Sequence, residues 1–224
     1  MQDPMMGMGD RQPHGDSLRL TRALAHDLRA SVHGLRMALE MMAGTLTPEG
    51  TNGVGRYLGM AQDEAAQLER IVEQLGLWIR LLGGDLKVRL QRLDLRALAA
   101  GRLEGLLDLD GESEPAFVMA DKSLMAPALD GLRDFLKAYA LPREHAGVRV
   151  HPDGEMELFG PPSLLPVLQS VVDNPVPDLA VAKGPAMWLV GPSLAVATCR
   201  ASEGTVWLEQ SDAGCALWLA WKKG

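Results

Sequence analysis

The chain has 224 residues, of which 47% are apolar and 23% are charged, and its formal net charge is −7. This length allows one or two domains, and the apolar fraction is high enough to fill a core, so a largely disordered chain is excluded. The longest apolar run, 186–199, is too short to span a membrane and contains Gly191 and Pro192. An acidic balance without a Lys/Arg-rich run argues against nucleic acid or an anionic membrane as the main partner.

Residues 1–16 mix Gly, Pro, Met and charged residues without a period, which predicts a mobile tail and not a signal peptide. The two cysteines, Cys199 and Cys215, define neither a disulfide framework nor a zinc cluster. We therefore expect a cytoplasmic protein with no membrane segment.

Two helices with regular apolar spacing are predicted after the tail. Apolar residues recur at alternating intervals of four and three over 28–42, and the same alternation continues over 58–82 until Gly83 and Gly84 stop it. The two helices predict an antiparallel hairpin over 17–84. Because a hairpin alone cannot bury both apolar seams, we expect it to pair with a second copy as a homodimeric four-helix bundle.

The remainder of the chain, 85–224, mixes strands and helices. Alternating residues predict strands at 87–93, 116–119, 148–150, 155–159, 205–210 and 215–221, and helices are expected at 94–107 and 122–141. A Pro-rich, helix-containing stretch leads to the apolar segment 187–199. The fold class is therefore α+β: a helical hairpin followed by an α/β sandwich with helices on one face.

The candidate for chemistry is His26, within the segment AHDLRASV at 25–32. With Leu28 and Val32 in the seam, His26 takes a position that faces solvent, where its neutral imidazole is a competent nucleophile for a phosphoryl group. The adjacent Asp27 could orient or polarise the ring. On spacing alone, an exposed helical histidine beside an aspartate is more typical of an ordinary solvated surface.

The segment HDLRAS resembles the H-box, H-[DE]-L-R-x-P, in the dimerisation and phosphoacceptor domain of bacterial sensor histidine kinases, with Ser31 at the proline position. The segments 120–140, 184–190 and 204–219 resemble the N-box helix, the lid glycine motif and the closing pair of strands of the kinase ATP-binding domain. The resemblance implies that His26 is the phosphoacceptor and Asp27 its orienting residue. It also implies response regulator receiver domains as partners, with a hybrid sensor kinase as a further candidate.

The chain departs from this family at the positions that bind nucleotide. Gly131 and Phe135 stand where the N-box has asparagines, and the segment 158–162 (LFGPP) stands where the adenine-reading D-x-G-x-G motif falls. A leucine cannot accept the hydrogen bond from the adenine amino group, and the asparagine that contacts magnesium and triphosphate is missing. Pro185 and Ala186 replace flexible lid positions. The departures imply that ATP binding is lost, that no cofactor is held, and that magnesium comes from the partner receiver domain.

Three more residues of the first helix are candidates for partner binding. His33 follows His26 by seven residues on the same face, and Arg29 and Arg36 lie on the exposed side, where they could meet an acidic receiver surface. A solvated surface is the alternative for each of them. Ala30 occupies the place where the kinase phosphatase signature has Thr or Asn, which argues against efficient phosphatase activity.

These features together predict a histidine phosphotransferase that shuttles a phosphoryl group between receiver-domain aspartates through His26, without ATP-dependent autophosphorylation. The alternative is a non-catalytic pseudokinase that binds and sequesters a response regulator or a kinase. A still active kinase is a third possibility and requires nucleotide binding.

Overall fold

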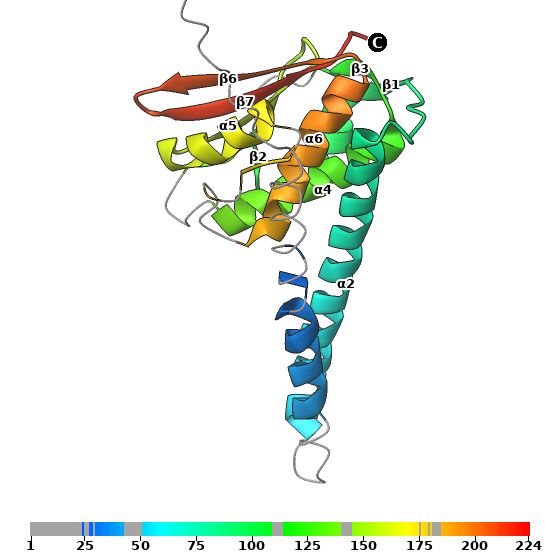
Figure 1. Ribbon diagram of the computed structural model, residues 1–224, viewed down its shortest axis with the longest axis vertical. Coiled ribbons are helices and arrows are strands. Elements are labelled where there is room, and N and C mark those ends of the chain that lie inside the picture. Colours follow the sequence, from blue (N-terminus) through cyan, green and yellow to red (C-terminus); the bar gives the residue numbers. More distant parts are fainter. Residues whose placement is uncertain are drawn as a thin grey trace, which may run out of the picture.

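Figure 1 presents the structure of the chain, a computed structural model. The residues that it describes are 24, 27, 28, 30–42, 51–108, 114–139, 145–174, 176–178, 180 and 185–224. The predicted tail, 1–16, lies outside them. The helical hairpin projects from one side of a domain made of helices and a sheet (Figure 1). No helix of the described residues combines the length and apolarity that a membrane crossing requires.

The hairpin consists of a first helix, described over 30–42 with helical positions at 24, 27 and 28, and of α2 (Thr51–Leu82). α2 begins seven residues before the first residue of its apolar seam, Leu58, and ends where the sequence predicts. The end is a glycine stop, because the Gly83 N–H donates to the Ile79 carbonyl at 2.9 Å and Gly84 has a φ of 74°, which suits glycine.

A five-stranded sheet forms the centre of the second part, in the order β2-β4-β5-β7-β6. Its strands are β2 (Leu107–Asp108), β4 (Gly147–Val150), β5 (Glu155–Gly160), β6 (Thr205–Ser211) and β7 (Gly214–Ala220). β2 pairs parallel to β4 and the other pairs are antiparallel. One face is apolar and buried, as Leu158 and Leu217 show, whereas Glu157 and Trp218 lie on the other face and are only half-buried.

Helices cover the apolar face of the sheet, as the sequence predicts. They are α4 (Lys122–Tyr139), α5 (Leu165–Asp173) and α6 (Val190–Ala201), with the short 3-10 helices η1 (Pro162–Leu164) and η3 (Ala186–Leu189). Asp121 precedes α4, and its carboxylate accepts hydrogen bonds from the backbone N–H and the hydroxyl of Ser123. A proline inside a helix ordinarily kinks or shortens it, but Pro192 does neither. It lies in the first turn of α6, where a backbone N–H has no intrahelical acceptor, so the helix continues to Ala201.

Two elements are shorter than predicted. The strand expected over 87–93 is β1 (Gln91–Asp94), because its antiparallel partner β3 (Phe117–Ala120) offers only four residues. The helix expected over 94–107 is α3 (Leu95–Ala100), capped by Asp94 as predicted, and it stops at Gly101. The chain then turns through Gly105, at a φ of 76°, into β2.

The core is continuous between the sheet domain and the upper half of α2. Ile71 and Trp78 of α2 are buried in the same cluster as Leu129 and Phe135 of α4 and Leu194 of α6. α2 runs alongside α6 and also contacts α4 (Figure 1). The hairpin is therefore packed onto the domain through α2 and not joined to it by a linker alone.

Candidate functional site

The first helix carries the predicted phosphoacceptor segment. His26 and Arg29 lie outside the described residues, so their predicted roles stay predictions. Asp27 and Leu28 are helical and half-buried, and the helix is continuous from 30 to 42. The site is therefore built from the described neighbours of His26.

Asp27 has a partner that the sequence did not predict. One oxygen of its carboxylate accepts a hydrogen bond from the backbone N–H of Met187 in η3, at 3.2 Å. The two residues are 160 positions apart, and η3 falls in the segment that resembles the kinase lid motif. The residue beside the predicted phosphoacceptor is thus bound directly to the C-terminal domain.

A hollow of about 260 Å³ lies beside this contact, between the first helix, α2 and η3. Asp27, Ser31 and Gly34 line it from the first helix, and Glu64 and Gln67 line it from α2. Pro185 and Trp188 close the side that faces the sheet domain. The surface next to the predicted phosphoacceptor is therefore composite, with contributions from both parts of the chain.

His33 and Arg36, the other predicted partner-binding residues, are exposed on the first helix. Arg36 forms an ion pair with Glu40, Nε to Oε1 at 3.2 Å, and both side chains are about two-thirds exposed. Such an exposed pair contributes little to stability and leaves the arginine accessible to a partner. Both positions fit an accessible surface, and their role in binding stays a prediction.

The apolar seams of the hairpin are only partly covered within one chain. Val32 and Leu39 of the first helix are 54% and 50% exposed, and their spacing is seven residues. On α2, Leu58, Val72 and Ile79 are 45%, 58% and 57% exposed, again at multiples of seven. A row of large apolar side chains at this spacing is typical of helices that pack against further helices. We call these five residues the exposed stripe.

The two positions that align with the N-box asparagines are packed in the interior. A Cβ added at Gly131 would lie 2.4 Å from the Gly191 Cα of α6 and 3.1 Å from Oε1 of Gln74 in α2. Phe135 has no exposed surface and stacks on Tyr139, with ring centroids 4.8 Å apart. The face of α4 that would meet a nucleotide in the kinase family is thus in contact with other helices.

The place of the adenine-reading motif is also apolar. Leu158 of β5 is fully buried opposite Leu217, and Phe159 faces the open side of the sheet. Neither side chain has an acceptor for an adenine amino group. Among the described residues, no group of three or more His, Cys, Asp or Glu side chains could hold a metal ion.

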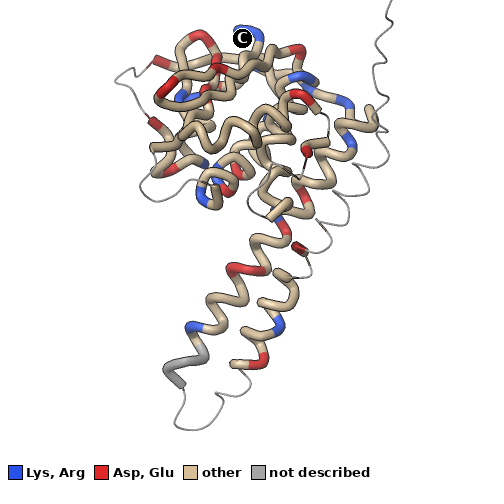
Figure 2. Tube along the Cα trace, turned by 60° about the vertical axis from the view of Figure 1, so that its left-hand side comes forward, with Lys and Arg blue, Asp and Glu red and all other residues tan. Residues whose placement is uncertain are grey.

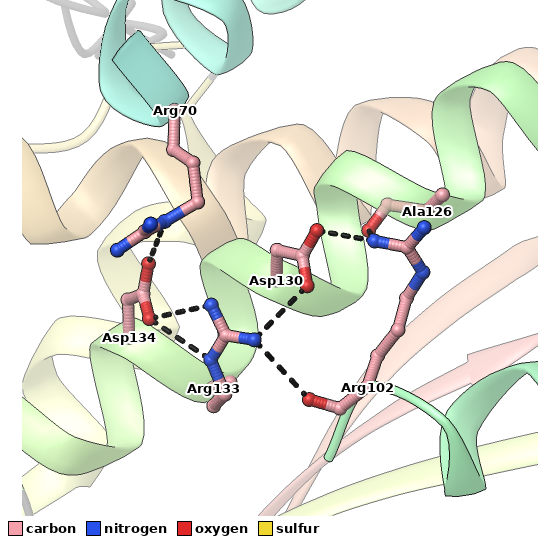
Figure 3. Close-up of polar contacts among 6 residues, drawn as sticks. All are labelled: Arg70, Arg102, Ala126, Asp130, Arg133 and Asp134. Carbon is pink, nitrogen blue, oxygen red and sulfur yellow. Dashed lines mark hydrogen bonds and ion pairs between the residues drawn. The ribbon is translucent and has the colours of Figure 1, made fainter. Parts of the chain in front are cut away.

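Five charged side chains join α2, α4 and the turn after α3 (Figure 3). Arg70 of α2 binds Asp134 of α4, with Nε and Oδ2 3.4 Å apart, and Arg133 binds the same carboxylate at 3.0 Å. Arg133 also reaches Asp130 at 3.2 Å, and Arg102 forms a second ion pair with Asp130. The network fixes α4 against α2 at the end of the hairpin that carries Asp27.

Sequence reasoning missed the partners that bring these segments together. The Asp27–Met187 and Arg70–Asp134 contacts join residues 160 and 64 positions apart, and no local motif marks either of them. Gly131 was noticed only because an asparagine is missing there. The pairing of Gly131 with Gly191 requires knowledge of how α4 and α6 cross.

Over the part of the chain that the structure describes, the charged residues form no single binding face. Figure 2 shows acidic and basic positions interspersed over the sheet domain and sparse along the hairpin.

Comparisons with known proteins agree with this architecture. Residues 17–77 match the family described as the His Kinase A (phospho-acceptor) domain. No curated protein matches the chain. Among solved structures, the histidine kinase AdeS of Acinetobacter baumannii has a TM-score of 0.52 at 16% identity, over 89% of this chain and 98% of that one.

Two further structures are more distantly similar. Full-length ShkA in complex with AMPPNP has a TM-score of 0.46 at 16% identity, over 92% of this chain and 46% of that one. A histidine kinase from Burkholderia phymatum STM815 has a TM-score of 0.40 at 14% identity, over 92% and 99% of the two chains. The hairpin therefore matches a phosphoacceptor-type domain over 17–77, and the fold of the chain, a helical hairpin followed by an α/β sheet domain, is similar to that of a histidine kinase core.

Proposed function

We propose that this protein is a histidine phosphotransferase that moves a phosphoryl group between receiver-domain aspartates through His26 and does not phosphorylate itself from ATP. The observation that carries the proposal is the packing of Gly131 and Phe135. Both positions align with asparagines of the kinase N-box, the second of which contacts magnesium and triphosphate in that family, and both are packed against other helices or in the core. Phosphoryl transfer from ATP depends on those contacts, so the phosphoryl group is more simply supplied by another protein.

The proposed reaction has two matched steps. The unprotonated ring nitrogen of His26 attacks the phosphorus of an aspartyl phosphate, a nitrogen–phosphorus bond forms, and the acyl phosphate bond breaks to release the aspartate carboxylate. The proton on the other ring nitrogen is lost to solvent. In the second step the other ring nitrogen takes a proton back from solvent, a carboxylate of a second receiver domain attacks the phosphorus, and the nitrogen–phosphorus bond breaks to release the neutral imidazole of His26. The receiver domain supplies magnesium in both steps.

The chain's own contribution in this proposal is to position the histidine. The Asp27–Met187 hydrogen bond and the Arg70–Asp134 ion pair hold the phosphoacceptor end of the hairpin against the sheet domain. A fixed imidazole needs less reordering when the aspartyl phosphate arrives, which lowers the entropic part of the barrier. The composite surface around Asp27 gives the receiver domain a second wall beside the hairpin.

A homodimer is part of the proposal. The exposed stripe leaves five large apolar side chains about half exposed in a single chain, and burial of the rest of each against a second hairpin is favourable by about 0.7–1.5 kcal/mol before the entropic cost of association is subtracted. A four-helix bundle formed by two copies would cover this stripe.

Transfer of radiolabel tests the proposal. The purified chain is mixed with receiver domains that carry 32P-aspartyl phosphate, and we expect acid-labile, base-stable label on it within seconds. His26→Ala should abolish the label and keep the fold. The matched control is His145→Ala, which replaces an exposed histidine just before β4 and should keep the label. Incubation with labelled ATP and magnesium should give no label. Persistent label on His26→Ala, or label from ATP, would contradict the proposal.

The same experiment separates the alternative function. A regulator that only sequesters its partner would bind a receiver domain with equal affinity in the wild type and in His26→Ala, and would form no phosphohistidine. The Asp27–Met187 hydrogen bond favours this alternative in one respect, because it engages the carboxylate next to His26 with the chain's own backbone.

A further inference from the structure

A second groove, of about 360 Å³, lies where α2 of the hairpin meets the sheet domain. Its walls come from three helices: α2 contributes Trp78, α5 contributes Val171, and α6 contributes Val196 and Ala197. The volume falls at the lower end of the roughly 300–1,000 Å³ typical of small-molecule sites. None of these residues belongs to the surface around Asp27.

The interior of the groove is mainly apolar, with the buried hydroxyl of Ser193 and the side chain of Asn174 as its polar lining, and its mouth is charged. Trp78, Val171 and Val196 are each at most 3% exposed, whereas Arg200 is exposed. On α6, Val196, Ala197 and Arg200 follow the three- and four-residue spacing of a single helix face. The guanidinium of Arg200 therefore lies next to the apolar residues, at the outer end of the groove. An occupant must therefore be apolar over most of its length and polar at one end.

Arg200 defines the polar end. Its Nη2 donates to the Val172 carbonyl at 2.7 Å, which holds the guanidinium at the rim beside α5. No carboxylate of the described residues forms an ion pair with it. A guanidinium that is held in place and has donors to spare is suited to a planar carboxylate.

We propose that the groove between α2, α5 and α6 binds a straight-chain carboxylate of medium length, with the carboxylate at Arg200 and the alkyl chain against Trp78 and Val196. A bound molecule would contact the hairpin and the sheet domain at once, so it would resist their separation. Because this binding does not involve His26, its test is independent of the phosphotransferase proposal.

Equilibrium dialysis of the full-length chain with radiolabelled decanoate provides the test, below the concentration at which the acid forms micelles. We expect one saturable site per chain. Octanoate should bind more weakly by about fourfold for each methylene removed, because each buried methylene contributes a constant increment. Decylamine, with the opposite charge, should compete poorly, whereas decanol should compete through its chain alone.

Variants assign the site. Arg200→Gln should weaken decanoate binding about tenfold and leave decanol unchanged, as expected for the loss of one charge-assisted contact. Arg80→Gln is the matched control, since Arg80 is also exposed, near the end of α2, and does not line the groove. Ala197→Phe should abolish binding of both ligands by filling the groove. Ala201→Leu, at the exposed end of α6, fills it nearer the mouth and serves if Ala197→Phe does not fold.

The proposal is overturned by any of three results. The first is an absence of saturable decanoate binding to the wild type. The second is equal affinity of the wild type and Arg200→Gln for decanoate. The third is unchanged binding in a folded variant whose groove is filled.

Discussion

The close contact between α4 and α6 predicts that an alanine at position 131 destabilises the fold, although alanine usually stabilises a helix. Gly131 lies in the middle of α4, where replacing glycine by alanine ordinarily stabilises a helix by about 0.5–1 kcal/mol. The added Cβ would lie 2.4 Å from the Gly191 Cα, which is a backbone atom and cannot swing away. Overpacking of this kind costs typically about 1–3 kcal/mol, and a backbone clash belongs at the upper end. We therefore expect Gly131→Ala to lower the free energy of unfolding by about 2 kcal/mol.

Urea unfolding followed by circular dichroism measures this change, with the slope of the transition compared as well as its midpoint. Gly76→Ala provides the matched control, because Gly76 is in α2, is exposed, and would have no atom within 4 Å of the added Cβ. This control should gain about 0.5–1 kcal/mol from helix propensity alone. The two alanine substitutions are thus expected to move stability in opposite directions.

A stabilised Gly131→Ala variant would refute the reasoning, since it would mean that α4 and α6 do not approach each other so closely. The same geometry predicts that Gly131→Asn destabilises the fold further and does not create binding of magnesium and ATP. A thermal shift with nucleotide measures the second point. Nucleotide binding by Gly131→Asn would indicate that the missing side chain, and not the closed space, is what prevents binding.

Three further predictions follow from exposure and ionisation. Val72→Asp, in the exposed stripe, should convert the proposed dimer into a folded monomer, and the neighbouring Glu73→Asp should leave the dimer intact. Light scattering measures the molecular mass of both variants. An unchanged mass in Val72→Asp would contradict the proposed bundle. For Asp121, burial raises the pKa, but the hydrogen bonds from Ser123 and from the backbone of Arg89 outweigh it and hold the pKa below its usual value. The ionised Asp121 carboxylate therefore stabilises the fold above its unfolded pKa of about 3.9. This stabilisation is lost as pH falls through the lower pKa of the folded state. Asp121→Asn should lower the free energy of unfolding by about 1 kcal/mol at pH 7 and by less at pH 3.5, as measured by urea unfolding. A loss of stability that does not change with pH would contradict this prediction. Burial raises the pKa of the Cys199 thiol to about 12 and also raises that of Cys215. Neither should react with a thiol reagent at pH 8 until the protein is unfolded, and rapid labelling of the native chain would contradict the burial of both.

Local sequence signals were enough to predict most of the elements. The stop of α2 at Gly83 and Gly84, the cap of α3 at Asp94 and the turn at Gly154 all follow from residues that favour those conformations. The helices on one face of the sheet follow from the alternation of apolar residues in the strands. Where the elements differ in length, as in β1, the cause is the length of the paired strand, which is not local information.

The candidate site could be predicted less completely for the same reason. The phosphoacceptor segment is a short motif and is visible in the sequence, and His33 and Arg36 were placed on the exposed side by helical periodicity. The hydrogen bond from Met187 to Asp27 depends on how η3 meets the first helix. No spacing rule relates residues on two elements so far apart in the chain, so contacts of this kind appear only in the folded structure.

The packing of α4 also relates the proposed loss of ATP binding to the position of the hairpin. Gly131 lets both the Gly191 backbone and the Gln74 side chain of α2 approach α4, and the Arg70–Asp134 ion pair lies one turn further along the same helix. The surface that would hold a nucleotide is therefore the surface that holds α2. An enzyme that used its own bound ATP would have to bring that nucleotide to His26, whereas one that takes its phosphoryl group from a receiver domain needs only a fixed, accessible histidine. Under the proposed function, closing the nucleotide site and fixing the hairpin are consequences of the same contacts.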